Sequence, residues 1–254
     1  MENKNLNHAK STFRDTFNGV RGKEFKSNRA NNTGIGKTFE DIVGVEENNN
    51  PKKDWDNQIE IKSQRGKTNS KLTLFCKKPE NDNALNHIKN TYGTSDESFN
   101  DVKTIHTTIS AKKYNSYKKK YGFKMNIDRD SKKINVSVRS HTTKELLEDN
   151  VVEFSFSDLK ESFDNKCSCV AYVNADSRTD ANGSEHFTFT EGKFLEGADF
   201  DDFLNNMEQG KIVYELRCGT YKSGKKLGNP HDHGSAFRIK KKSIEEFFPN
   251  HEEI

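Results

Sequence analysis

Cysteine is scarce in this chain of 254 residues, and no two cysteines form a CxxC pair. The four cysteines, Cys76, Cys167, Cys169 and Cys218, are too few and too widely spaced for a structural zinc site. We expect reduced, mostly buried thiols of an intracellular protein, with Cys167 and Cys169 on one face of a strand. The chain also lacks an apolar N-terminal segment and any apolar run of about 18 residues, which argues against a secretory signal peptide and a membrane-spanning helix.

Apolar residues are few as well, at 30% of the chain, while charged residues reach 32%. The 18 phenylalanines and several β-branched runs can nevertheless build a core, so the composition does not indicate disorder. No internal repeat or domain linker is visible, and the length suits one large domain or one domain with two lobes. Strand and helix patterns mix without strict alternation, which favours the α/β (α+β) class, with a mixed central β-sheet flanked by helices.

The net charge of +3 is too small to indicate a polyanionic partner, but the charges are unevenly distributed. Residues 110–124 contain six lysines and no acidic residue, and residues 216–242 contain eight basic residues against Asp232 alone. Such runs attract phosphate backbones, although solvated lysine-rich loops account for either run equally well. The interleaved tyrosines of the first run slightly favour a clasp around a nucleic-acid backbone; they are Tyr114, Tyr117 and Tyr121.

Hydrophobic periodicity predicts the order of helices and strands. Helices are expected around residues 13–20, 34–44, 83–91, 157–163, 199–207 and 243–248. Strands are expected at residues 58–63, 71–76, 103–109, 123–128, 133–139, 167–174, 186–190, 212–218 and 235–239. The strand at 71–76 is expected to return beside the one at 58–63.

A Gly-Ile-Gly-Lys-Thr run begins at Gly34. It is not a P-loop, because the GxxxxGK[ST] spacing is absent and no predicted strand precedes it. Gly34 and Gly36 instead indicate close packing or the close approach of a backbone.

The most informative segment runs from Asp54 to Lys62. Ile59 and Ile61 alternate with Glu60 and Lys62, as in a half-buried strand, so Glu60 and Lys62 share one face. Two carboxylates can hold a hard divalent cation, and an ammonium beside them can act on an attacking water. The segment therefore indicates a metal-dependent phosphodiesterase, while a plain salt bridge between Lys62 and Glu60 is the simpler alternative.

Three segments together resemble the MvaI/BcnI family of Type II restriction endonucleases, which is related to the mismatch-repair nickase MutH. They are Asn32–Asp41, the Glu-x-Lys of Ile59–Lys62, and Tyr221–Ile239 with its His-Asp-His-Gly-x-Ala-Phe-Arg-Ile run. The resemblance spans residue 31 to the C-terminus and is nearer to MvaI than to BcnI. Glu-x-Lys alone is unspecific, whereas its combination with the third segment is specific.

The resemblance implies a PD-(D/E)xK core in one domain over residues 1–254, with a catalytic lobe mainly in 31–110 and a DNA-recognition lobe mainly in 111–254. It implies cleavage of duplex DNA with one or two Mg²⁺ ions, for which Mn²⁺ can substitute, whereas Ca²⁺ binds without supporting cleavage. A monomer is expected to nick each strand in turn at a short CC-N-GG-like site. The expected setting is the bacterial cytoplasm, with no membrane partner and with a protective DNA methyltransferase in the same host that is not a physical partner.

The family motif also implies roles for single residues. Glu60 and Lys62 fall on its Glu-x-Lys, and Glu40 matches the acidic residue on the first core helix, close to the metals. The expected catalytic set is thus Asp54, Glu60, Lys62 and Glu40, and the expected metal ligands are Asp54, Glu60 and the carbonyl of Ile61.

The upstream acid is the least certain match. Asp54 is chosen because an aromatic residue, Trp55, follows it, as is usual in the family. Asp56 stays open because the intervening segment varies in length, and the proline that usually precedes the acid is Lys53 here.

DNA recognition is expected in the C-terminal region. Glu215 and Arg217 are two residues apart on a predicted strand and so share a face, where arginine can read guanine and a carboxylate can accept from cytosine N4. The family uses an acid and an arginine at these positions on C·G pairs. The other expected DNA contacts are Tyr221, Lys225, Lys226, His231, Asp232, His233 and Arg238.

Two of these groups also allow a different role. Arg238 fits a strand-end salt bridge as well as a phosphate contact. A metal site in the His-Asp-His run is disfavoured, because three adjacent residues rarely converge on one ion. The remaining histidines receive no role; they include His87, His106, His141 and His186.

Two alternatives stay open. One is a MutH-like strand-specific nickase or a methylation-dependent nuclease. The other is a catalytically inactive, sequence-specific DNA-binding module, against which the intact Asp, Glu and Lys set argues.

Overall fold

The computed structural model describes residues 2–29, 33–46, 52–96 and 102–254, so Asn32, in the first motif, lies outside the described residues. The chain divides into two compact units. The first contains Met1–Leu72, Asp164–Asp199 and Lys241–Ile254, and the second contains Thr73–Phe163 and Phe200–Lys240. Each unit is therefore assembled from stretches that are separated in the sequence.

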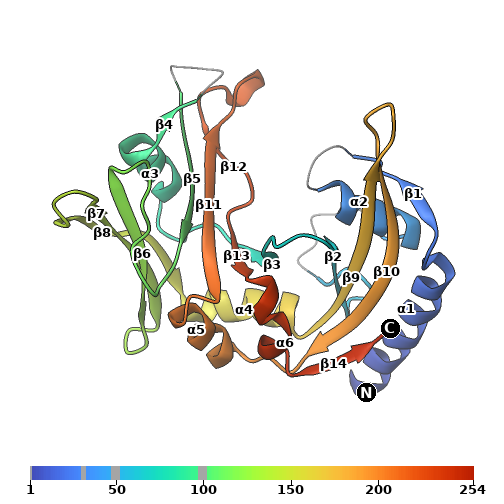
Figure 1. Ribbon diagram of the computed structural model, residues 1–254. Helices are drawn as coiled ribbons and strands as arrows, with labels where there is room; N and C mark the ends of the chain where they lie inside the picture. Colours follow the sequence, from blue (N-terminus) through green and yellow to red (C-terminus); the bar gives the residue numbers. More distant parts are fainter. Residues whose placement is uncertain (1, 30–32, 47–51, 97–101) are drawn as a thin grey trace. The chain divides into compact units, whose positions relative to one another are not determined.

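The first unit is built on a five-stranded sheet whose two long central strands run antiparallel beside each other (Figure 1). The strand order is β1 (Glu24–Lys26), β10 (Glu185–Glu196), β9 (Cys169–Thr179) and β2 (Glu60–Arg65), and β14 (Asn250–Glu253) also pairs with β10. β2 is parallel to β9. The strand with the Glu-x-Lys motif therefore lies at the edge of this sheet.

Helices cover one face of this sheet. α1 (Glu2–Val20) and α2 (Gly34–Val43) pack there. α6 (Ile244–Phe247), which follows the short 3-10 helix η2 (Lys241–Ser243), lies on the opposite face, where Glu245 pairs with Lys193 of β10. In the part of the chain that the structure describes, no helix combines the length and apolar character that a membrane crossing requires.

The core of the first unit is rich in phenylalanine because the two helices place aromatic rings over alternate residues of the sheet. Ile61 of β2 and Ala171 of β9 point into this core, so their neighbours Glu60 and Lys62 lie on the opposite face. The core phenylalanines are Phe13, Phe17, Phe39, Phe187, Phe189 and Phe194.

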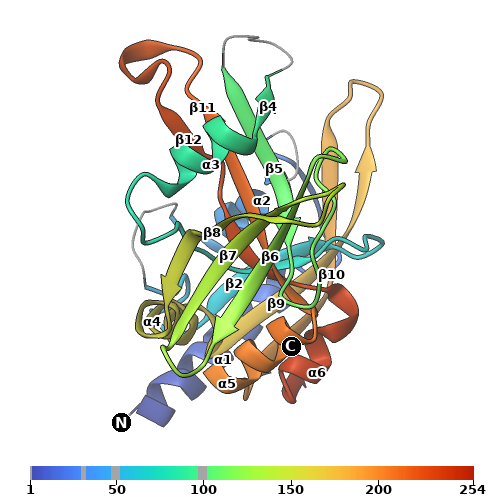
Figure 2. The same cartoon turned by 90° about the vertical axis from the view of Figure 1, so that its left-hand side faces the viewer.

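The second unit contains two sheets. The larger has the order β3 (Leu72–Cys76), β13 (Ala236–Ile239), β11 (Ile212–Thr220), β5 (Lys103–Ile109) and β4 (Thr94–Ser95), with β12 (Pro230–Asp232) also paired to β11. The smaller is an antiparallel ladder of β6 (Tyr121–Asp128), β7 (Lys133–Ser140) and β8 (Leu146–Ser155), seen side by side in Figure 2. Its remaining elements are α3 (Ala84–Tyr92), α5 (Phe200–Glu208), η1 (Gly224–Lys226) and the larger part of α4 (Phe156–Cys167).

The mixed α/β class expected from the sequence is confirmed, but two local predictions are wrong. β3 does not return beside β2; it pairs with β13 in the second unit, a partner more than 150 positions away that no local pattern identifies. Cys167 and Cys169 do not share a strand, because Cys167 ends α4 and Cys169 begins β9. Cys167 continues the buried helical row of Leu159 and Phe163, which spacing by fours explains.

The thiols fit the remaining expectation. All four cysteines are unpaired, and three of them, Cys167, Cys169 and Cys218, are buried. Strand β8 was not expected, because most of its first residues are exposed and show no apolar alternation.

Gly34 and Gly36 form a matched pair for testing close packing in α2. A Cβ on Gly34 would lie 2.3 Å from the Arg29 carbonyl oxygen and 2.7 Å from Ser27 Oγ, whereas a Cβ on Gly36 meets nothing within 4 Å. We expect Gly34→Ala to lower the free energy of unfolding by roughly 1–3 kcal/mol. Gly36→Ala should raise it by up to about 1 kcal/mol, because alanine is the better helix former. Urea unfolding followed by the fluorescence of Trp55, the single tryptophan, measures both, and equal effects would contradict the packing role of Gly34.

Candidate functional site

A tight turn brings Asp54 back beside β2. The Trp55 amide donates to the Ile59 carbonyl at 2.9 Å, and the Ile59 amide donates to the Trp55 carbonyl at 3.1 Å. Asp56 and Asn57, at the tip of the turn, have left-handed φ angles of 49° and 57°. The chain therefore reverses within five residues and returns to the start of the strand.

Trp55 anchors this turn in the core of the first unit. Its ring meets Phe13 edge-on at 5.4 Å between centroids, and its indole Nε1 donates to Thr12 Oγ1 at 3.2 Å. Asp54 Oδ2 accepts a hydrogen bond from the Ile61 amide at 2.9 Å, whereas Asp56 is exposed. Of the two acids left open by the sequence, the structure brings Asp54 to the Glu-x-Lys motif.

The two acidic groups are close enough to repel. Burial raises the pKa of Asp54, and the charge of Glu60 raises it further, while the Ile61 amide and the nearby lysines oppose the shift. Asp54 therefore binds its proton more tightly than an ordinary aspartate.

Glu60 is a buried carboxylate whose two oxygens are each paired with an ammonium. The residue is 4% exposed, Lys62 Nζ lies 2.5 Å from Oε1, and Lys166 Nζ lies 2.8 Å from Oε2. Burial works against the charged form of Lys62, but its attraction and hydrogen bond to Glu60, together with Asp54, raise its pKa. The structure thus contains the salt bridge of the simpler alternative, with Glu60 buried and Lys62 half-buried.

Lys166 is a member of this site that the sequence did not identify. It lies in the last turn of α4, and its ammonium also donates to the Lys52 carbonyl at 3.0 Å. Its distance of 106 positions from Glu60 leaves no local spacing that could have revealed it. Only the return of the chain from α4 into β9 brings it to β2.

Glu40 is placed less directly. It lies half-buried on α2, next to Phe39 in the helix that packs against β2. The structure thus puts it on a neighbouring element, while the close cluster of the first unit consists of Asp54, Glu60, Lys62 and Lys166.

The donors at this site suit a hard cation. Two carboxylates converge, and the charge of Glu60 acts on Asp54, so a divalent ion bound by both would offset their repulsion. Within the described ranges, no group of three or more His, Cys, Asp or Glu side chains could hold a metal by itself. A cation here would therefore draw on few protein oxygens and complete its shell with water and substrate, which is the habit of Mg²⁺.

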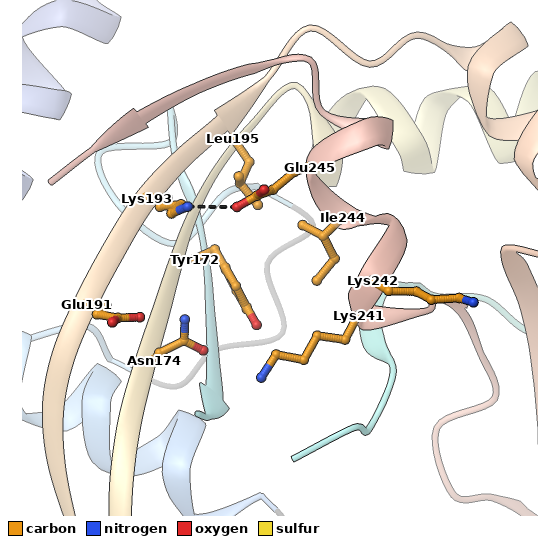
Figure 3. Close-up of a pocket in the computed structure, with 9 residues that line it drawn as sticks. All are labelled: Tyr172, Asn174, Glu191, Lys193, Leu195, Lys241, Lys242, Ile244 and Glu245. Carbon is orange, nitrogen blue, oxygen red and sulfur yellow. Dashed lines mark hydrogen bonds and ion pairs between the residues drawn. The ribbon is translucent and has the colours of Figure 1, made fainter. Parts of the chain in front are cut away.

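A pocket of 260 Å³ extends the face that carries Glu60 and Lys62 (Figure 3). Tyr172 on β9 is the register partner of Lys62, and on its other side it pairs with Lys193 of β10. The pocket residues Tyr172 and Lys193 are therefore on the next strand from Lys62 and on the strand after that. The ammonium of Lys241 reaches into it and donates to the carbonyls of Gly66 and Thr68. Its walls are Tyr172, Asn174, Glu191, Lys193, Leu195, Lys241, Lys242, Ile244 and Glu245.

A second cluster of charged residues lies in the second unit, where Glu215 and Arg217 share a face of β11. Arg217 Nη2 donates to Glu215 Oε2 at 2.7 Å, and Arg238 Nε on β13 lies 3.2 Å from the same oxygen. Burial lowers the pKa of Arg238, against the attraction of Glu215. One carboxylate thus holds two guanidinium groups on the same sheet.

The His-Asp-His loop is fixed to β11. Asp232 Oδ1 accepts from the Ser235 amide at 2.8 Å and from Ser235 Oγ at 2.7 Å. Ser235 Oγ in turn accepts from the Arg217 amide, and the His233 amide donates to the Arg217 carbonyl at 2.8 Å. One oxygen of Asp232 therefore orders the loop.

The two imidazoles of this loop and the ring of Tyr221 lie in contact with one another. The rings of Tyr221 and His231 stack at 4.1 Å and 16°, and the ring of His233 follows at 4.2 Å from His231. Lys226 lies over the Tyr221 ring at 5.4 Å, and Lys225 precedes it in the exposed η1. These residues form a row of planar and cationic groups suited to DNA contact.

The tyrosines of residues 110–124 do not form one exposed series. Tyr117 is 7% exposed and packs against Phe123, and Tyr121 meets the Tyr92 ring at 5.0 Å. Only Tyr114 stacks on a cation, at 4.0 Å from Arg139. The basic run is therefore anchored by its tyrosines, and its lysines are the groups left for a phosphate backbone.

Comparisons with known proteins identify the family of the chain and its structural relatives. The profile of the MvaI/BcnI restriction endonuclease family matches residues 15–248. Among solved structures, the chain is similar to restriction endonuclease MvaI in complex with its cognate DNA substrate, at 32% identity, 98% coverage of this chain, 97% of that chain and a TM-score of 0.85. It is also similar to MvaI in the absence of DNA, at 29% identity, the same two coverages and a TM-score of 0.62. No curated protein matches the chain.

The raised pKa of Asp54 predicts a pH-dependent stability. A carboxyl that binds its proton more tightly in the folded state favours folding in acid, and this contribution is lost as the pH rises through its folded pKa. We therefore expect Asp54→Asn, measured in EDTA, to raise the free energy of unfolding near neutral pH and to have no such effect well below the ordinary carboxyl range. Urea unfolding at a series of pH values tests this, with the exposed Asp56→Asn as the matched control. A stability gain that is independent of pH would contradict the raised pKa of Asp54.

Proposed function

The chain belongs to the MvaI/BcnI restriction endonuclease family, and from this premise we propose that its first unit cuts duplex DNA while its second unit reads the sequence. Membership makes it a DNA hydrolase. The observation that supports separate cutting and reading units is that the Glu-x-Lys cluster belongs to the first unit, whereas the Glu215–Arg217–Arg238 cluster belongs to the second. In this proposal the catalytic and recognition lobes are these two units, each built from separated stretches.

Metal dependence is typical of the family, and we assign Mg²⁺ as the metal here. The ligands in this proposal are the carboxylates of Asp54 and Glu60 and the carbonyl of Ile61, with one or two ions bound. Held by these residues, Mg²⁺ would supply charge neutralisation at the phosphoryl oxygens and the leaving 3′ oxygen, and would lower the pKa of the attacking water. Mn²⁺ can replace it, and Ca²⁺ binds without supporting cleavage, because catalysis depends on tighter geometry than Ca²⁺ imposes.

The side chains around the ion have separate tasks. Asp54 and Glu60 bind and orient the cation. Lys62, whose ammonium donates a hydrogen bond to Glu60 Oε1, orients the water or stabilises charge on the phosphate. Lys166 is a positioning residue: it holds Glu60 Oε2, so that the carboxylate stays in place when Lys62 turns to the substrate. Glu40 acts from α2, near the metal.

Recognition is assigned to the face of β11 and its attached loop. Arg217 donates to guanine O6 and N7, and Glu215 accepts from cytosine N4, which suits the C·G pairs of a CC-N-GG-like site. Tyr221, His231 and His233 contact bases or backbone. The cationic groups Lys225, Lys226 and Arg238 contribute phosphate contacts. Asp232 mainly orders the loop.

The enzyme acts as a monomer that nicks each strand in turn, and its host is protected by a DNA methyltransferase. Digestion of phage DNA of known sequence with Mg²⁺, followed by sequencing of the fragment ends, tests the function directly. A supercoiled plasmid should pass through an open circle to linear DNA. Open circles that persist would favour a MutH-like nickase, and intact DNA bound at one sequence would favour an inactive binding module.

The catalytic assignment predicts that Glu60→Ala or Lys62→Ala lowers the cleavage rate by at least on the order of 10²-fold while DNA binding survives. Each substitution removes one charged group that acts in the transition state. Lys166→Ala should cost less, because Lys166 does not touch the substrate in this proposal, and Lys166→Arg should restore part of the loss.

Single-turnover cleavage and gel-shift binding in Ca²⁺ measure the two effects separately. Lys23→Ala is the control, since Lys23 is an exposed lysine of the first unit outside this cluster. Cleavage at the normal rate by Lys62→Ala would remove Lys62 from the mechanism.

The recognition assignment predicts that Arg217→Ala costs roughly 1–3 kcal/mol of binding free energy and relaxes selectivity at one C·G pair. The loss is local because only the base pair under Arg217 loses its bidentate donor. Competition binding with oligonucleotides that vary one base pair at a time measures it. A uniform loss on all sequences would instead make Arg217 a phosphate contact.

A further inference from the structure

His106 lies on the same face as the residues assigned to base reading. In the antiparallel pairing of β5 with β11, His106 is the register partner of Arg217, and Thr108 is the register partner of Glu215. Directly paired residues of neighbouring strands point to the same side of a sheet. His106 is therefore the lateral neighbour of Arg217, from a strand that no motif connects with recognition.

The His106 ring joins the row of imidazoles that begins at Tyr221. Its centroid lies 6.0 Å from that of His233, at an interplanar angle of 77°. The His233 ring can approach β11 closely because Gly219 has no side chain: a Cβ there would be 2.6 Å from His233 Nε2. Gly219 thus makes room for the contact between the two histidines.

The His106 side chain is available for an outside partner. The residue is exposed, and within the described residues its ring nitrogens make no hydrogen bond. This separates it from His186, which is paired with Asp180, and from His87, which is paired with Glu148. A polar ring held beside an arginine, and itself without a hydrogen bond, is suited to an external partner.

The ring is set to act as a neutral imidazole. Partial desolvation of the ring lowers the pKa of His106, and the charge of Arg217 lowers it further. The groups that face the ring are Arg217 from β11 and His233 from the loop after β12, whereas Thr104 and Thr108 on its own strand carry no charge. A neutral imidazole offers one N–H donor and one acceptor nitrogen, which gives it a directional hydrogen-bond pattern rather than a simple positive charge.

We propose that His106 is a further base-reading residue of the recognition face, donating to the N7 edge of a purine beside the base pair read by Arg217. This rests on the proposed function, since it takes the β11 face as the surface that meets the bases. Neighbouring strands are about 4.8 Å apart and base pairs rise about 3.4 Å. Side chains that leave adjacent strands therefore reach neighbouring base pairs, not the same one.

The test compares wild type, His106→Ala and His106→Gln on one cognate duplex and on duplexes that change one base pair at a time. We expect His106→Ala to lower specific binding about ten- to a hundredfold on the cognate site and to lose discrimination at one base pair. His106→Gln keeps a donor and an acceptor and should recover part of that discrimination. His141→Ala is the matched control, because His141 lies beyond the end of β7 in the smaller sheet of the same unit.

The outcomes separate the two proposals. An unchanged base preference in His106→Ala, or an equal loss on every duplex, overturns the role of His106 while leaving the endonuclease function intact. A wild-type protein that shows no base preference at all would instead overturn the proposed function. Circular dichroism on each variant establishes that the fold is retained.

Discussion

The organisation of the first unit depends on one buried carboxylate. Glu60 exposes 4% of its surface, and an ion so placed is costly unless both oxygens are satisfied. Lys62 satisfies one from the same strand, and Lys166 satisfies the other from the end of α4. Because those lysines come from distant parts of the sequence, their joint hold on Glu60 ties the edge strand to the helix that leads into β9. The Asp54 turn completes a small, balanced group of two negative and two positive charges.

The second unit uses a related device on its own sheet. Glu215 is shared by two arginines, and Ser235 fastens the histidine loop to the backbone of Arg217. Side chains held in this way lose little freedom when they meet a partner, so less of the interaction energy is lost to ordering. A reading surface that is already ordered also discriminates sharply, since it cannot adapt its hydrogen bonds to a wrong base.

Local patterns predicted what depends on neighbours in the sequence. The alternation at 59–62 predicted the strand, the face shared by Glu60 and Lys62, and, with the later motif, the family that the comparisons confirm. What failed depends on pairing across the chain: β3 with β13, Lys166 with Glu60, and His106 beside Arg217.

The interleaving of the two units has a consequence during synthesis. The sheet of the first unit needs β14 to complete the edge of β10, and Ile254 is part of its core. A ribosome that has made everything up to Lys240 has therefore produced the whole second unit but an incomplete first one. With the division of labour proposed above, every stretch of the unit that reads DNA is synthesised before the last stretch of the unit that cuts it.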